Sequence, residues 1–323
     1  MISRLSRRDF LAATAAAGAA AAGTLSTAAV PAMAHPQARH KMILCLSGGA
    51  IGVSANQREA IDLAAQHGFE AVEAYGSYLA SLNDEQMADL KAYMKTKGIL
   101  FAYGGLPVEF RKDDSAFAAG MKALPQTAAG LQRAGVTRTT TWIMPCHDKL
   151  PYMTNFRLHA VRLRESASLL KDYGIRLGLE YVGPKTLWAS KRYSFIRTMA
   201  EMKDLISEIG TGNIGFLLDT YHWWTAGDTE EDLLSLKNED VVSVDMNDGV
   251  AGVPRDEQID GKRELPCKTG VIDTATFINA LNRIGYDGPV RVEPFNKEVN
   301  ALGKDGACAA AIQALKRAIA LIR

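Results

Sequence analysis

The 323-residue sequence lacks an excess of charge of either sign, because 37 lysines and arginines are balanced by 36 aspartates and glutamates. A net charge of +1 provides no broad basic field to hold a nucleic-acid backbone, so nucleic-acid binding is not expected. Cysteine is scarce, and the four cysteines form no CxxC pair, which argues against a zinc ribbon and a thioredoxin-type redox site. The apolar fraction of 47% is enough for one large core or two smaller ones.

The sequence also lacks the GxGxxG turn that typically follows an early strand in a doubly wound sheet. From Lys41 onward, short apolar runs rich in Val, Ile or Leu alternate with longer amphipathic stretches. Eight strand–helix units over about 280 residues match the size of a (β/α)₈ TIM barrel, an α/β fold. We therefore predict a single barrel domain over residues 41–323, in preference to an open doubly wound sheet. The predicted strands are 42–47, 71–75, 99–103, 139–144, 176–181, 214–219, 241–247 and 290–294.

The first 34 residues differ in composition from the rest. Ser6–Leu11 (SRRDFL) is a twin-arginine pattern, an uncharged stretch rich in Ala and Gly follows, and Ala32–Ala34 has the small-x-small pattern of a signal-peptidase site. Alanine and glycine insert poorly into a bilayer, which favours a signal peptide over a transmembrane anchor. We expect a twin-arginine signal peptide at 1–34 and a linker at 35–40. The export machinery of that pathway, which carries folded proteins, would place the mature chain in the periplasm or another extracytoplasmic compartment.

Four of the late predicted strands have a carboxylate at their C-terminal end or within two residues of it. In a parallel barrel the C-terminal strand ends meet at one face, which is where catalytic groups lie. Taken alone, any one such acid is explained equally well as a structural residue whose carboxylate is fully hydrogen-bonded. Four carboxylates at one point repel one another unless a cation lies between them or their pKa values are raised so that some are protonated. A divalent metal ion with oxygen ligands is the simplest solution. The predicted metal ligands are Glu180, Asp219, Asp245 and Glu293.

Histidines and tryptophans follow the same strand ends. His222 comes three residues after Asp219, where substrate binding or proton transfer is favoured over a solvated rim histidine. His147 follows the fourth strand and is a second candidate substrate contact, while His159 falls on a predicted helix and is assigned no role. Tryptophans beyond the fifth and sixth strands either pack the rim or stack against a sugar. These are Trp188, Trp223 and Trp224.

Three segments of the second half resemble the xylose-isomerase-like barrel family, the group that contains sugar isomerases, ketose 3-epimerases and endonuclease IV. Gly178–Thr186 (GLEYVGPKT) is similar to the fifth-strand segment of sugar phosphate isomerase/epimerase members. Leu217–His222 (LLDTYH) is similar to their LLDxxH segment, and Gly285–Phe295 (GYDGPVRVEPF) to their closing GYDGPVxVEPF. The resemblance extends over the barrel from about Lys41 to the end of the chain.

This resemblance implies a metal site with one departure. In the family's ketose 3-epimerases a glutamate, an aspartate, a histidine and a second glutamate hold one divalent metal. Glu180, Asp219 and Glu293 match three of these, but Asp245 stands where the histidine is expected. An all-oxygen site favours Mn²⁺ or Mg²⁺ over Zn²⁺ or Co²⁺. The alternatives are that Asp245 does not coordinate the ion, or that the metal site has been lost.

A further resemblance concerns substrate binding. Arg263–Cys267 (RELPC) resembles the epimerases' RxxPG, whose arginine contacts substrate, with Cys267 in the place of the glycine. Arg263, His222 and Lys185 are therefore expected to orient substrate oxygens. A surface position in the loop after the fifth strand is the alternative for Lys185.

Together these residues imply a metal-dependent sugar isomerase or epimerase that acts through an enediolate, with Glu180 and Glu293 as base and acid. Elimination from a 3-keto glycoside shares this intermediate, so a lyase is an alternative, as is a non-catalytic sugar-binding barrel. An enzyme like endonuclease IV is disfavoured, because it would need a basic face and more histidines than the barrel offers. The expected partner is a small sugar, not phosphorylated because no dedicated phosphate loop is found. A homo-oligomer is left open.

Overall fold

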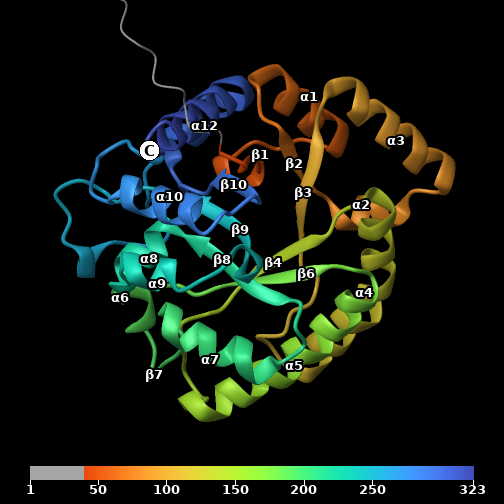
Figure 1. Cartoon of the computed structure of the whole chain (residues 1–323). Coiled ribbons are helices and arrows are strands. Elements are labelled where there is room, and N and C mark those ends of the chain that lie inside the picture. Colours follow the sequence, from red (N-terminus) through yellow and green to blue (C-terminus); the bar gives the residue numbers. More distant parts are fainter. Residues whose placement is uncertain (1–39) are drawn as a thin grey trace, which may run out of the picture. The chain divides into compact units, whose positions relative to one another are not determined.

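The computed structural model describes residues 40–323, so the predicted signal peptide at 1–34 and nearly all of the predicted linker at 35–40 lie outside the described residues. Eight parallel strands close into a barrel in the order β1-β10-β9-β8-β6-β4-β3-β2, with helices around it (Figure 1). This confirms the predicted TIM barrel. The barrel strands are β1 Ile43–Leu46, β2 Ala71–Ala74, β3 Leu100–Gly105, β4 Arg138–Trp142, β6 Arg176–Glu180, β8 Ile214–Asp219, β9 Val241–Met246 and β10 Pro289–Val292.

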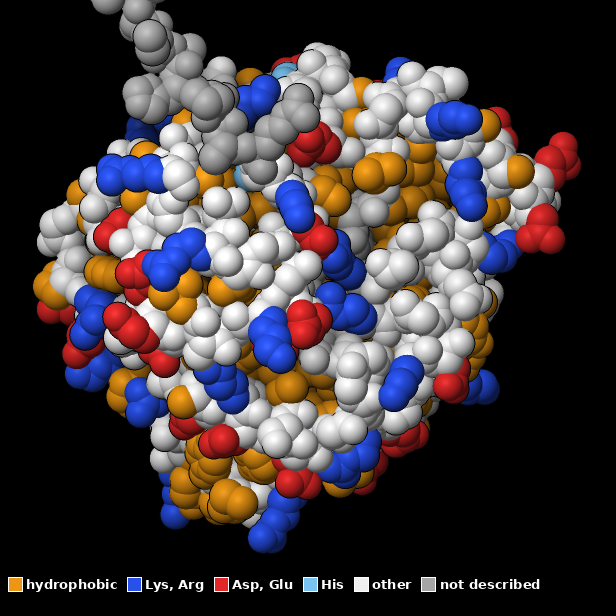
Figure 2. All heavy atoms as spheres, in the orientation of Figure 1, with side chains coloured by type: hydrophobic (Ala, Val, Ile, Leu, Met, Phe, Trp, Pro, Cys, Tyr) orange, Lys and Arg blue, Asp and Glu red, His pale blue; other side chains and the backbone are white. Residues whose placement is uncertain are grey.

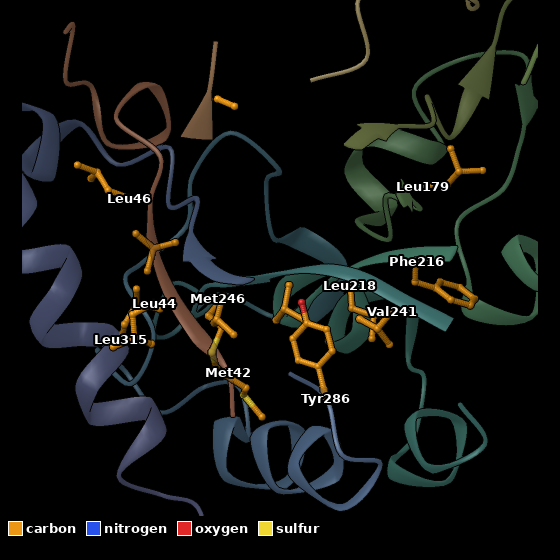
Figure 3. Packing of buried hydrophobic residues seen from close by; sticks show 14 of the residues in the cluster. Met42, Leu44, Leu46, Leu179, Phe216, Leu218, Val241, Met246, Tyr286 and Leu315 are labelled. Carbon is orange, nitrogen blue, oxygen red and sulfur yellow. The ribbon is translucent and has the colours of Figure 1, made fainter. Parts of the chain in front are cut away.

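Strand side chains alternate between the helical layer and the barrel interior, because successive residues of a strand face opposite sides. Leu44 of β1 lies beside Leu315 of α12 (Gly303–Ile319), as Figure 3 shows. The next residue, Cys45, belongs instead to a small interior cluster that includes Tyr103 of β3. The same alternation decides which residues of β6, β8, β9 and β10 reach the interior.

The outer layer consists of helices whose ends are well defined by their sequence. Asn83 caps the start of α3 in a capping box: its side chain accepts from the backbone N–H of Gln86 at 2.8 Å, and the Gln86 side chain accepts from the backbone N–H of Asn83 at 3.0 Å. None of the helices in residues 40–323 is both long enough and apolar enough to span a bilayer. The longer helices are α1 Gln57–His67, α3 Asp84–Lys97, α4 Asp114–Ala134, α5 Tyr152–Asp172, α7 Met199–Ile209, α10 Thr274–Arg283 and α12.

Short elements that the sequence did not predict follow several strands at their C-terminal ends. β5 (Cys146–His147) and β7 (Tyr193–Ser194) pair antiparallel outside the barrel. A short helix follows directly or closely after β6, β8 and β10. These helices are α6 Lys185–Trp188, α8 Thr220–Ala226 and α11 Lys297–Ala301. The remaining short helices are α2 Gly76–Ser81, α9 Glu230–Leu234, η1 Gly49–Ile51, η2 Asn238–Asp240 and η3 Arg255–Glu257.

Charges of both signs mingle on the surface. Figure 2 shows Lys and Arg side chains interspersed with Asp and Glu over the face in view, where neither sign forms a continuous field. This distribution agrees with the net charge of +1. A long-range field that would steer a polyanion toward this face is not generated by such a pattern.

Candidate active site

Four carboxylates meet at the C-terminal ends of four adjacent strands. Glu180 and Asp219 are the last residues of β6 and β8, Asp245 lies one residue before the end of β9, and Glu293 directly follows β10. The parallel register places Asp245 beside Asp219. Each acid offers one oxygen, and these oxygens all lie within 4.8 Å of one another. The structure thus brings together the four residues that the sequence predicts as metal ligands.

A cavity of about 560 Å³ adjoins this carboxylate ring, a size usual for small-molecule sites. Glu180 and Glu293 form part of its wall, whereas Asp219 and Asp245 are fully buried and do not line it. The two glutamates are therefore accessible from the cavity, whereas the two aspartates influence it through their charge.

Burial and mutual repulsion raise the pKa values of these acids. Burial, followed by repulsion from Glu293, Asp219 and Asp245, raises the pKa of Glu180 well above its usual range. Burial raises the pKa of Glu293 to about 7, although Arg291 opposes the shift. Burial likewise raises the pKa of Asp219 to about 6. Carboxyl groups with such values can gain and lose a proton near neutral pH.

Arg291 holds Asp245 from inside the barrel. The two residues are neighbours in the register of β9 and β10, and Arg291 donates from Nε to Oδ1 of Asp245 and from Nη2 to Oδ2, the latter at 2.6 Å. Both Asp245 oxygens are therefore bound by one guanidinium. Arg291 also donates to the hydroxyl of Tyr103 and lies 3.3 Å from Oε1 of Glu293. Arg291 was not among the residues predicted from the sequence, although its spacing of two from Glu293 puts both on the inward face.

Arg263 is the second buried cation of the site. Its Nη1 donates to Oδ2 of Asp219 at 2.8 Å, and its Nη2 donates to Oδ1 of Asp260 at 2.6 Å. The side chain lines the cavity, which is where the predicted substrate contact requires it. Asp260 also lines the cavity. It was not predicted as a site residue from the sequence, because it lies in the long connection between β9 and α10.

His222 lies in the first turn of α8 and lines the same cavity. Its Nε2 is 3.2 Å from Nη2 of Arg263 and 3.7 Å from Oε1 of Glu180. Burial, with a further effect of Arg263, lowers the pKa of His222 to about 3, so the ring is neutral at pH 7. A neutral ring carries a proton on only one of its two nitrogens, and Nδ1 of His222 faces the backbone N–H of Gly183 at 3.4 Å.

The structure places two predicted substrate contacts outside the cavity, and for Lys185 this agrees with the alternative of a surface position. Lys185 begins α6, and its Nζ pairs with Asp256 at 2.7 Å on the surface and does not line the cavity. His147 lies in β5, where its Nδ1 accepts from the backbone N–H groups of Lys149 and Leu150, and it lines a neighbouring hollow. Both follow strand ends, but the short elements there turn their side chains elsewhere.

The tryptophan of the cavity wall also differs from the prediction. Trp142 at the end of β4 lines the cavity, and none of the three tryptophans beyond the fifth and sixth strands does. Trp188 is instead stacked with Arg197, whose guanidinium carbon lies 4.1 Å from the ring centroid, and Trp223 is buried against Phe277. For those two residues the structure agrees with packing of the rim, one of the two alternatives predicted from the sequence.

Backbone strain is found close to the site. Cys267 and Phe295 have positive φ angles of 61° and 44°, a region that costs residues with a side chain about 1–2 kcal/mol. Cys267 stands at the position where the resemblance to RxxPG places glycine, the residue that adopts a positive φ most readily. Phe295 lines the cavity, with the guanidinium carbon of Arg263 4.8 Å from its ring centroid. Such strain is common at functional sites.

The donor set fits one divalent cation. With Asp260 included, five carboxylates and two guanidinium groups sum to a formal charge of about −3, most of which a dication neutralises. Oε1 of Glu180 is buried and has no hydrogen-bond partner within residues 40–323, so it is free to bind an ion. Glu180, Asp219 and His222 form a second possible group of ligands. Asp245 is the least available of the acids, because Arg291 already binds both of its oxygens.

Comparison with known proteins agrees with this architecture. Residues 61–321 match the family described as xylose isomerase-like TIM barrel. The inosose isomerase of Bacillus velezensis is 22% identical over 260 residues, which cover 80% of this chain and 90% of that protein. A solved xylose isomerase domain protein from Alicyclobacillus acidocaldarius subsp. acidocaldarius is 31% identical, with a TM-score of 0.77 over 87% of this chain and 99% of that one.

The solved structure of the IolI protein contains a bound zinc atom. It has a TM-score of 0.72 at 20% identity and covers 86% of this chain and 98% of its own. Besides the inosose isomerase, the relatives include proteins named ketose 3-epimerase and D-psicose 3-epimerase. The chain therefore belongs to the xylose isomerase-like TIM barrel family, and it is an enzyme of the isomerase type.

Proposed function

We propose that the chain is a metal-dependent isomerase or epimerase of a non-phosphorylated keto-sugar. The observation that carries this proposal is the pair Glu180 and Glu293, which line one cavity from strands separated by β8 and β9. Two carboxyl groups on different sides of a small ligand, both with raised pKa values, suit removal of a proton and its return.

In this mechanism Glu180 takes the proton from the carbon next to the sugar carbonyl, and Glu293 delivers one from the other side. Return to the opposite face of the same carbon gives an epimer, and return to the neighbouring carbon gives an isomer. Arg263 and neutral His222 hold the substrate oxygens at the cavity wall. A divalent ion, when bound, polarises the carbonyl and an adjacent hydroxyl.

Glu180, Asp219 and Glu293 would hold that ion, while Asp245 remains with Arg291 and contributes through its charge. Oxygen donors favour Mn²⁺ or Mg²⁺. The zinc in the related IolI structure makes Zn²⁺ the next ion to test, followed by Co²⁺.

Solvent-deuterium exchange into a panel of free ketoses and 3-keto sugars, with each ion added in turn, tests the proposal. Deuterium at one carbon of a recovered sugar, together with its epimer or isomer, is the expected result. Loss of a β-substituent would identify the lyase alternative, which shares the proton removal. A protein that binds sugars but exchanges no hydrogen with any ion would show that the barrel is a binder, and the proposal would be wrong.

We also propose that the mature enzyme acts outside the cytoplasm. The support is the twin-arginine pattern at Ser6–Leu11 and the small-x-small pattern at Ala32–Ala34. N-terminal sequencing of the exported protein is expected to find His35 as the first residue. A chain that starts at Met1 and stays in the cytoplasm would contradict this location.

A further inference from the structure

Asp260 offers an unused acceptor atom to the cavity. Its side chain lines the cavity and is 29% exposed. Oδ1 accepts from Nη2 of Arg263 at 2.6 Å, whereas Oδ2 has no hydrogen-bond partner within residues 40–323. Oδ2 is also absent from the fully buried, unpartnered atoms of that range, so it is accessible to solvent. A ligand in the cavity can therefore donate a hydrogen bond to this oxygen.

The backbone around Asp260 is held in place from three directions. The carbonyls of residues 258, 259 and 260 each accept a hydrogen bond from a side chain. The donors are Thr186 of α6 at 2.7 Å, Tyr221 of α8 at 2.9 Å and Arg263 at 2.8 Å. Although Asp260 lies in a long connection, its position relative to the cavity is thus fixed by the two short helices that follow β6 and β8.

The neighbouring cation has little left to offer a ligand. All three side-chain nitrogens of Arg263 already have acceptors in the protein. Nε donates to the carbonyl of Asp260, Nη1 to Oδ2 of Asp219 at 2.8 Å, and Nη2 to Oδ1 of Asp260. Arg263 can therefore contact a substrate oxygen only through a donor that it shares, whereas Oδ2 of Asp260 is unshared.

Asp260 lies close to the reacting end of the cavity. Nε2 of His222 is 3.7 Å from Oδ1 of Asp260 and also 3.7 Å from Oε1 of Glu180. A sugar carbon that reaches Glu180 therefore brings its neighbouring hydroxyl groups within reach of Asp260. Because Arg263 pairs with it, Asp260 is ionised at neutral pH. An ionised carboxylate accepts from a hydroxyl group and repels a phosphate.

We propose that Asp260 is a substrate-binding residue whose Oδ2 accepts from a sugar hydroxyl near the carbon that Glu180 deprotonates. The same charge selects the neutral sugar over its phosphate. That the ligand is a sugar rests on the proposed function. The contact itself rests on the accessible, unpartnered oxygen and on the fixed backbone that presents it.

Calorimetric titration of Asp260→Asn without added metal ion, so that no turnover competes with binding, tests this contact. The asparagine keeps an oxygen for Arg263 but replaces Oδ2 with an NH₂ group, which donates. The probes are D-fructose, D-tagatose, D-psicose and L-sorbose. The ketohexose that the wild type binds most tightly is expected to bind the variant about 10- to 100-fold more weakly, as loss of a hydrogen bond to a charged group implies.

The phosphates of D-fructose separate a lost contact from a damaged site. At least one of D-fructose 1-phosphate and D-fructose 6-phosphate is expected to bind Asp260→Asn more tightly than the wild type, because a negative charge has left the cavity. The matched control is Asp256→Asn in the same connection, which removes the same charge from a surface pair with Lys185. That control is expected to leave the affinities for ketohexoses and phosphates unchanged.

Two results would overturn the contact. Unchanged ketohexose affinity in Asp260→Asn would show that Oδ2 binds no hydroxyl group. Weaker binding of ketohexoses and phosphates alike would show that Asp260 only maintains the shape of the site. Because binding is measured without turnover, these results are distinct from failure of the proposed function. Sugar binding that depends on Asp260, in a protein that exchanges no hydrogen, would support this contact and contradict the proposed reaction.

Discussion

Replacing Glu180 with glutamine is expected to abolish hydrogen exchange into the substrate while leaving the barrel at least as stable as before. An amide cannot accept the substrate proton, and loss of a general base typically lowers the rate by about 10²- to 10⁴-fold. The fold does not suffer, because Oε1 of Glu180 has no hydrogen-bond partner within residues 40–323. Removing a buried acid also removes its repulsion with Glu293, Asp219 and Asp245.

Deuterium exchange and urea unfolding on the same preparation measure both parts of this prediction. The matched control is Glu208→Gln on α7, where the glutamate pairs with Arg164 at the surface. That control is expected to keep the wild-type exchange rate. If Glu180→Gln exchanged hydrogen as fast as the wild type, Glu180 would have no role in proton transfer.

Arg291→Met is expected to lower the free energy of unfolding by about 3–5 kcal/mol, the usual cost of leaving a buried charge without its partner. Asp245 is completely buried, and Arg291 binds both of its oxygens. Adding Asp245→Asn to Arg291→Met removes the unpaired charge. The double variant is therefore expected to recover most of the loss, although Tyr103 also loses its bond to Arg291.

Urea unfolding of the wild type, both single variants and the double variant forms a double-mutant cycle for this pair. A large coupling free energy between Asp245 and Arg291 is the expected outcome. Additive effects would mean that Asp245 is stabilised by something else, and it would then return to the set of candidate metal ligands.

The acids of the ring could be predicted from sequence because two simple rules locate them. Strand ends meet at one face of a parallel barrel, and each acid closes an apolar run whose length and composition indicate a strand. Arg291 obeys the same alternation as Glu293 but was overlooked, because a cation inside a strand does not suggest a ligand. Its partner Asp245 was predicted as a metal ligand, and the structure groups it with the other three acids while also pairing it with Arg291.

The rest of the site depends on contacts between segments that are distant in the sequence. His159 has no local feature to distinguish it from any helical histidine, and its burial against Phe110 and Phe195 depends on segments far away in the sequence. Lys185 is the opposite case. Its position after a strand end predicted a side chain in the cavity, but at the start of α6 that side chain points to the surface and pairs with Asp256. Loop elements of two to seven residues decide these directions, and their sequences contain no periodic signal.

The Arg291–Asp245 pair also limits how this barrel can change by mutation. Replacing Asp245 with the histidine expected from the family's epimerases would remove both bonds between that residue's carboxylate and the buried guanidinium of Arg291. Loss of Arg291 alone would leave the buried carboxylate of Asp245 without its cation. Each one-step path to a four-ligand metal site with histidine thus passes through a destabilised protein. The two substitutions are accessible only together, or after other changes have made the barrel stable enough to tolerate the intermediate.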